Sequence, residues 1–77
     1  MSAKAILLIS VDLGRENTVL NKLKSIRNVK EVHVTYGVYD LIVEVEAGSP
    51  EQLKKTVTYE IRALADIRST LTMVVVE

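Results

Sequence analysis

The chain has 77 residues, with ten Lys and Arg against ten Asp and Glu, one His and no Cys. This length supplies one small core, which excludes a multidomain enzyme, and the neutral charge balance argues against nucleic-acid binding, which needs a basic surface. Without Cys there are no disulfides or thiolate metal sites, and we expect no metal and no cofactor. No apolar run approaches the roughly 18 residues of a membrane span, and no signal peptide is recognisable. We therefore predict one cytoplasmic domain, residues 1–77.

The first half of the chain predicts a strand, a helix and a hairpin. Residues 5–13 are almost continuously apolar and rich in Ile, Leu and Val, which favours a strand. Residues 15–26 carry apolar side chains at helical spacing. Residues 30–36 and 39–47 alternate in polarity on either side of Gly37, which is typical of two strands joined by a tight turn.

The second half predicts a helix and a closing strand. Ser49 is a good N-cap, Pro50 suits the first helical position, and the apolar residues that follow keep helical spacing: Leu53, Val57, Ile61 and Leu64. Residues 68–77 are rich in Thr and Val, as strands are. The resulting order β-α-β-β-α-β predicts the α+β class, as a ferredoxin-like sandwich with two helices on one face of a four-stranded antiparallel sheet.

Both faces of the first strand are apolar. Leu7, Ile9 and Val11 occupy one face, and Ile6 and Leu8 occupy the other. Two helices cover only one side of the sheet, so a monomer would expose a large apolar patch. We predict a homo-oligomer, a two-fold dimer that packs sheet against sheet, and we place Leu7, Ile9 and Val11 at its interface.

The sequence offers little for catalysis. His33 lies in mid-strand without a sequence-adjacent partner, which is typical of a surface or interface histidine. The pairs Asp12 with Glu16 and Glu44 with Glu46 are better explained by a helix start and a solvated strand face. We therefore predict no catalytic residue, no metal ligand and no enzymatic activity.

The most informative polar residues follow the hairpin turn. Gly37 permits the turn, and Asp40 places a carboxylate at the start of an apolar strand, where it is costly unless paired. It can pair with a ligand or simply hydrogen-bond its own turn. Alternation places the hydroxyls of Thr70 and Thr72 on one face of the last strand, although strand propensity alone also explains threonines there.

Two segments resemble a known family. Residues 37–43, Gly-Val-Tyr-Asp-Leu-Ile-Val, and residues 67–72, Ile-Arg-Ser-Thr-Leu-Thr, resemble the glycine-x-x-aspartate hairpin and the closing threonines of the effector-binding (RAM) domain of Lrp/AsnC feast/famine regulators. The resemblance covers essentially the whole chain. It implies dimers that associate through their sheets, larger rings that are often octamers, and an amino acid effector between dimers. The ligand-binding residues that it implies are Gly37, Val38, Tyr39, Asp40, Thr70 and Thr72.

The chain departs from that family in one respect. Full-length members carry an N-terminal helix-turn-helix domain, whereas this sequence begins at the first strand, so it looks like a stand-alone version. Such a domain would act as an amino acid sensor or co-assemble with full-length regulators.

Two other classes of protein are alternatives for this sequence. A dimeric α/β-barrel enzyme would use His33 or Asp40, and an RNA-recognition-like module would need aromatic residues on its central strands, whereas Tyr36 and Tyr39 flank a turn.

Overall fold

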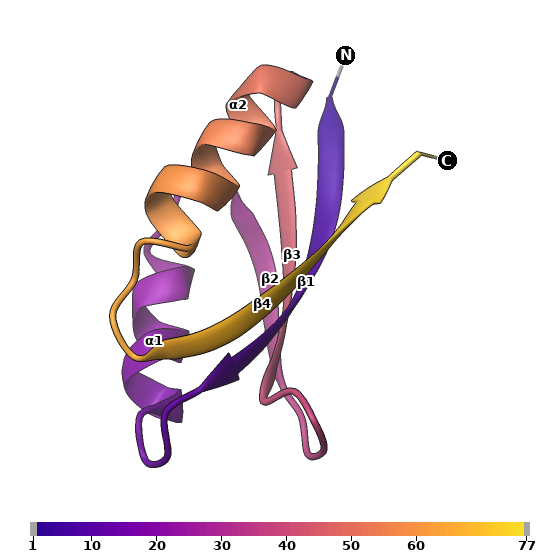
Figure 1. Ribbon diagram of the computed structural model, residues 1–77. Coiled ribbons are helices and arrows are strands. Elements are labelled where there is room, and N and C mark those ends of the chain that lie inside the picture. Colours follow the sequence, from indigo (N-terminus) through magenta and orange to yellow (C-terminus); the bar gives the residue numbers. More distant parts are fainter. Residues whose placement is uncertain (1, 77) are drawn as a thin grey trace.

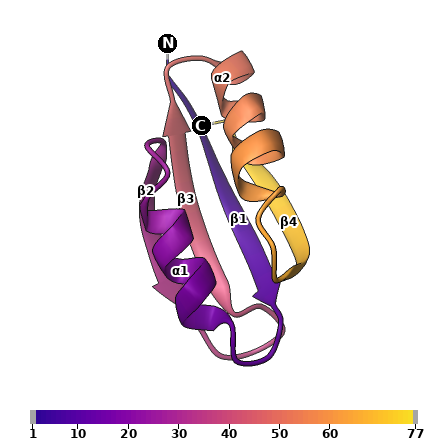
Figure 2. The same ribbon diagram turned by 90° about the vertical axis from the view of Figure 1, so that its left-hand side faces the viewer.

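The structure, a computed structural model, describes residues 2–76 and confirms the predicted fold class. Four strands form one antiparallel sheet in the order β2-β3-β1-β4, with the helices on one face, as in ferredoxin-like folds (Figures 1 and 2). The elements are β1 (Ala3–Val11), α1 (Glu16–Lys24), β2 (Val29–Val34), β3 (Leu41–Ala47), α2 (Pro50–Lys55), the π-helical segment η1 (Thr56–Ile61) and β4 (Ile67–Val75).

The second helix begins as the sequence predicts and then widens. The Ser49 hydroxyl accepts a hydrogen bond of 3.2 Å from the amide of Gln52, and Pro50 follows as the first helical residue. After Lys55 the helix becomes a π-helix, in which the amide of Arg62 donates to the carbonyl of Val57, five residues back, over 2.9 Å. The helices of the described chain are all too short or too polar to span a lipid bilayer.

The core lies between the helices and one face of the sheet. Val19 and Leu23 of α1 and Ile61 of η1 are fully buried. On the sheet side the core consists of alternate residues of the two central strands, β1 and β3: Ala5, Leu7, Ile9, Val11, Leu41, Val43, Val45 and Ala47. This is the period-two pattern expected of strands with one face under a helix layer.

The predicted interface residues belong to this core, so their assignment to a dimer interface is wrong. Leu7 and Ile9 are 0% exposed and Val11 is 4% exposed within the single chain. They lie on the helix-covered face, where no partner could reach them. Both faces of β1 are apolar, so alternation alone could not show which one the helices cover.

The opposite face of the sheet is free of helices and carries an apolar stripe. Strand pairing places Leu8 beside Ile42 and Leu71, and Ile6 beside Met73. Leu71 and Met73 are exposed, and Ile6, Leu8 and Ile42 are half-buried. We call these five residues, Ile6, Leu8, Ile42, Leu71 and Met73, the open-face patch.

Several element boundaries differ from the predicted ones. The first strand runs two residues earlier than expected, because a turn closed by the amide of Arg15 and the carbonyl of Asp12, 3.0 Å apart, follows Val11. Gly14 adopts a positive φ of 82° within this turn, and Leu13 is left in solvent. The last strand ends at Val75, and Glu77, which the prediction included, lies outside the described residues.

A matched pair of leucines tests this core. We expect Leu7→Ala to lower the free energy of unfolding by about 2–5 kcal/mol, because it removes a fully buried side chain and leaves a cavity. Leu13→Ala, at a side chain that is 97% exposed, should change it by less than about 0.5 kcal/mol. Urea denaturation at one fixed protein concentration measures both. Equal losses would contradict the core assignment.

Candidate functional site

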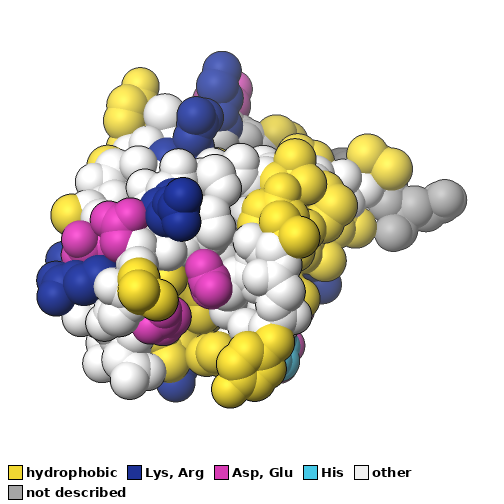
Figure 3. All heavy atoms as spheres, turned by 60° about the horizontal axis from the view of Figure 1, so that its bottom comes forward, with side chains coloured by type: hydrophobic (Ala, Val, Ile, Leu, Met, Phe, Trp, Pro, Cys, Tyr) yellow, Lys and Arg dark blue, Asp and Glu magenta, His cyan; other side chains and the backbone are white. Residues whose placement is uncertain are grey.

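One end of the molecule brings together the hairpin and the last strand. The β2–β3 hairpin and the β1–α1 loop project at the same end (Figure 1). Between them lies an open hollow of about 370 Å³, lined by residues 37–40 of the hairpin together with Ser10, Arg68 and Ser69 of β1 and β4. Figure 3, which views the molecule from this end, shows acidic and basic side chains close together among hydrophobic ones.

Local hydrogen bonds hold the hairpin in shape. Gly37 has φ of +138°, a conformation that residues with a side chain rarely adopt. The amide of Thr35 donates to the carbonyl of Asp40, and the hydroxyl of Thr35 donates to the carbonyl of Tyr39, each over 2.8 Å. The hairpin therefore presents residues 37–40 to the hollow on a fixed backbone.

Asp40 ties the hairpin to the central strand. Its amide donates to the carbonyl of Ile9 over 2.9 Å, and its carboxylate oxygen Oδ2 accepts a hydrogen bond of 2.9 Å from the amide of Val11. The alternative in which the Asp40 carboxylate bonds its own turn is therefore wrong, because the carboxylate bonds strand β1. The second oxygen, Oδ1, has no hydrogen bond to any residue in the range 2–76, and the Asp40 side chain is half-buried.

Arg68 also lines the hollow, although the sequence did not predict it as a site residue. Ser69 pairs with Ser10, but Val11 pairs with Ile67, so Arg68 is an extra residue that bulges out of β4. Bulges redirect a side chain relative to the regular strand, and this one brings Arg68 to the wall of the hollow. The Ser10 and Ser69 hydroxyls hydrogen-bond to each other beside it. Nothing in the strand pattern of the sequence marks the bulge.

The hollow therefore has three charged side chains in its lining: the carboxylates of Asp40 and Glu16 and the guanidinium of Arg68. Among the described residues, no ion pair within 4.0 Å joins Asp40 to Arg68. Arg15, on the loop nearby, is already paired with Asp66 over 3.1 Å. Asp40 and Arg68 can thus each bind a ligand group, whereas Glu16 already accepts a hydrogen bond of 3.3 Å from the amide of Gly14.

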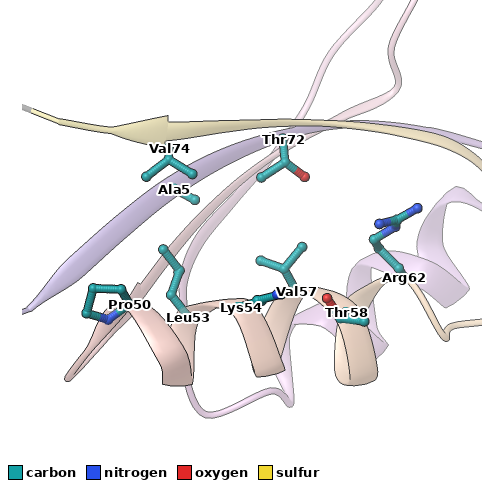
Figure 4. Close-up of a pocket in the computed structure, with 9 residues that line it drawn as sticks. All are labelled: Ala5, Pro50, Leu53, Lys54, Val57, Thr58, Arg62, Thr72 and Val74. Atoms are coloured by element: carbon teal, nitrogen blue, oxygen red, sulfur yellow. The ribbon is translucent and has the colours of Figure 1, made fainter.

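The two predicted threonines lie elsewhere. Thr70 pairs with Ile9 and Thr72 pairs with Leu7, so both hydroxyls share one face, as predicted, but it is the helix side of the sheet. Thr72 lines a separate groove between β4 and the second helix (Figure 4). The structure thus splits the six predicted ligand-binding residues, with Gly37, Val38, Tyr39 and Asp40 in the hollow and the threonines outside it.

The residues that an α/β-barrel enzyme or an RNA-recognition-like module would use also lie apart from one another. His33 lies on edge strand β2, where its Nε2 is 3.4 Å from a carboxylate oxygen of Glu31, and it does not line the hollow that contains Asp40. Tyr36 projects fully into solvent, whereas Tyr39 lines the hollow. The central strands β1 and β3 carry no aromatic residue on which a base could stack.

A ferredoxin-like sheet with an open hollow lined by charged side chains defines a small α+β domain. The comparison with protein families agrees, because the model described as "Lrp/AsnC ligand binding domain" matches residues 4–77. The chain belongs to this family.

Three relatives are similar to this chain. A crystal structure of a hypothetical protein from Pyrococcus horikoshii, PHS023, is 38% identical, with a TM-score of 0.91, over 100% of this chain and 92% of that one. An uncharacterized HTH-type transcriptional regulator of Pyrococcus furiosus is 30% identical over 59 residues, which are 77% of this chain and 39% of that protein. Homocitrate synthase of Sulfurisphaera tokodaii is 41% identical over 59 residues, again 77% of this chain but 13% of the enzyme. The chain thus matches less than half the length of these two curated relatives.

Two substitutions at Asp40 separate its hydrogen bond from its charge. Asp40→Ala should lower the free energy of unfolding by about 1–3 kcal/mol, because the partly buried amide of Val11 loses its acceptor. Asp40→Asn keeps an oxygen in place as acceptor and should lower the free energy of unfolding by less. Amide hydrogen exchange at Val11 reports the bond directly, and unchanged exchange in Asp40→Ala would contradict its importance.

Proposed function

We propose that this domain binds a free α-amino acid in the hairpin hollow and acts as a homodimeric, non-enzymatic regulatory module. The observation that supports the proposal best is the unpaired arrangement of Asp40 and Arg68 around one open volume. The family description as a ligand-binding domain and the likeness to an HTH-type transcriptional regulator support the regulatory role.

Asp40 and Arg68 are complementary to the two charges of an amino acid. A free amino acid carries an ammonium and a carboxylate on the same carbon. The ammonium would donate to Oδ1 of Asp40, and the carboxylate would accept from the Arg68 guanidinium, which suits bidentate binding. The Ser10 and Ser69 hydroxyls stand beside Arg68 and can bind further polar atoms. The volume, about 370 Å³, lies at the small end of the range for ligand sites, roughly 300–1,000 Å³.

The open-face patch would form the dimer. It is continuous across β1, β3 and β4, and an apolar surface of this kind is normally covered. A two-fold axis would bring the patch against its own copy, which is the commonest symmetry of soluble oligomers. Polar residues border it, including the Lys4–Glu44 ion pair of 3.2 Å. Assembly of such dimers into octamers is part of the proposal through the family resemblance.

The regulatory partner would be another protein that responds to whether this domain has bound its ligand. The domain would act as a sensor by itself or co-assemble with full-length Lrp/AsnC regulators, and the cytoplasmic location predicted from the sequence agrees with either role. Amino acid binding between dimers would then couple ligand concentration to assembly.

A thermal-shift screen with the common amino acids tests the ligand. An amino acid present at about 100 times its Kd adds about 2.7 kcal/mol to the folded state and should raise the Tm of a domain this small by roughly 10 °C. We expect Arg68→Gln and Asp40→Asn each to weaken the binding of that amino acid about tenfold or more, because each removes a charge-assisted hydrogen bond.

Arg27→Gln is the matched control, since Arg27 is an exposed cation outside the hollow and should bind the amino acid like the unaltered protein. If no amino acid shifts the Tm, or if the Arg68 and Asp40 variants bind as well as the control, the proposed ligand site is wrong.

Sedimentation velocity tests the dimer. Leu8→Lys places a charge in the middle of the open-face patch and should convert dimers to folded monomers, with circular dichroism as the check on folding. Leu13→Lys makes the same change at an exposed side chain outside the patch and should leave the dimer intact. A dimer that survives Leu8→Lys would place the interface elsewhere.

A further inference from the structure

The helix layer does not close over the C-terminal half of the last strand. α2 packs on β1 and β3, and β4 crosses away from it toward the C-terminal end (Figure 1). Val74 pairs with Ala5 and so faces the helix side, yet it is 61% exposed whereas Ala5 is 0% exposed. An open groove of about 350 Å³ therefore runs between β4 and the second helix.

The groove is apolar at one end and polar at the other. Figure 4 shows Val74 and Ala5 on the strands opposite Leu53 on the helix, with Pro50 beyond them. At the far end the view shows Thr72 on β4 and, across from it, Thr58 and the guanidinium of Arg62. A molecule with a short apolar chain and a polar head group would lie along this gradient.

The charge at the groove has a single sign. Lys54 and Arg62 line it, and its lining includes no Asp or Glu. Neither cation forms an ion pair with a carboxylate of residues 2–76. An anionic head group is therefore favoured, and an ammonium has no partner here, in contrast to the hollow that contains Asp40.

The π-helical segment builds the polar end. The hydrogen bond from the amide of Arg62 to the carbonyl of Val57 closes a five-residue turn, so these two residues stand one above the other on the groove side. A regular α-helix brings residues three and four apart onto one face instead. Buried Thr56, whose hydroxyl accepts a hydrogen bond of 2.8 Å from the side-chain amide of Asn28, holds the segment against the domain.

We propose that this groove is a second ligand site, distinct from the amino acid hollow, that takes a small apolar monocarboxylate such as a short fatty acid or a branched 2-oxo acid. The carboxylate binds Arg62 and the hydroxyls of Thr72 and Thr58, and the hydrocarbon lies between Val74 and Leu53. The site lies within one chain and does not depend on the function proposed for the hairpin hollow.

A set of probes with one chain length and three head groups tests this site by NMR titration of the full chain. Hexanoate should shift the signals of Val57, Thr72 and Val74, while hexanol and hexylammonium bind at least about tenfold more weakly because they lack the anionic head group. Arg62→Gln should weaken hexanoate binding about tenfold, and Lys24→Gln, an exposed cation outside the groove, should not. Asp40→Asn should leave hexanoate binding unchanged.

Four results would overturn the proposal. Hexanol that binds as tightly as hexanoate, or an Arg62→Gln variant with unaltered hexanoate affinity, would show that the cation does not select the ligand. The absence of shifts at about 10 mM hexanoate would show that the groove does not bind it. Groove signals that change with protein concentration and do not respond to hexanoate would assign the groove to a second copy of the chain.

Discussion

The architecture depends on a mismatch between a sheet with two apolar faces and a helix layer that covers part of one. β1 is central and apolar on both sides, so burial of its Leu7 and Ile9 under the helices leaves Ile6 and Leu8 on the opposite face. The same layer does not close over the C-terminal half of β4, whose helix-side Val74 stays exposed. The proposed dimer surface and the proposed carboxylate groove both contain apolar side chains that the helices leave exposed.

Asp40 connects the fold to the site. Its amide donates to the carbonyl of Ile9 and its carboxylate oxygen Oδ2 accepts from the amide of Val11, so the hairpin is fixed to the central strand β1. The remaining oxygen is thereby held at the hollow without a flexible loop to order, which lowers the entropy lost on binding a ligand. One carboxylate thus stabilises the structure and offers a negative charge to the proposed amino acid.

The elements that sequence reasoning placed well are those with a local signal. Ser49 and Pro50 mark the start of the second helix because capping involves only neighbouring residues. Alternation correctly groups Thr70 with Thr72 and separates the two faces of the first strand. The widening of the second helix to a π-helix, which places Arg62 over the groove, has no comparable local signature.

The sequence by itself determined the order of elements, the fold class and the hairpin with its glycine and aspartate, because hydrophobic periodicity and turn chemistry are local properties. Only the tertiary structure decided which face of β1 meets the helices, which is why Leu7, Ile9 and Val11 proved to be core residues. It also decided that the bulge in β4 brings Arg68 to the hollow that Asp40 lines, since pairing register depends on strands far apart in the chain.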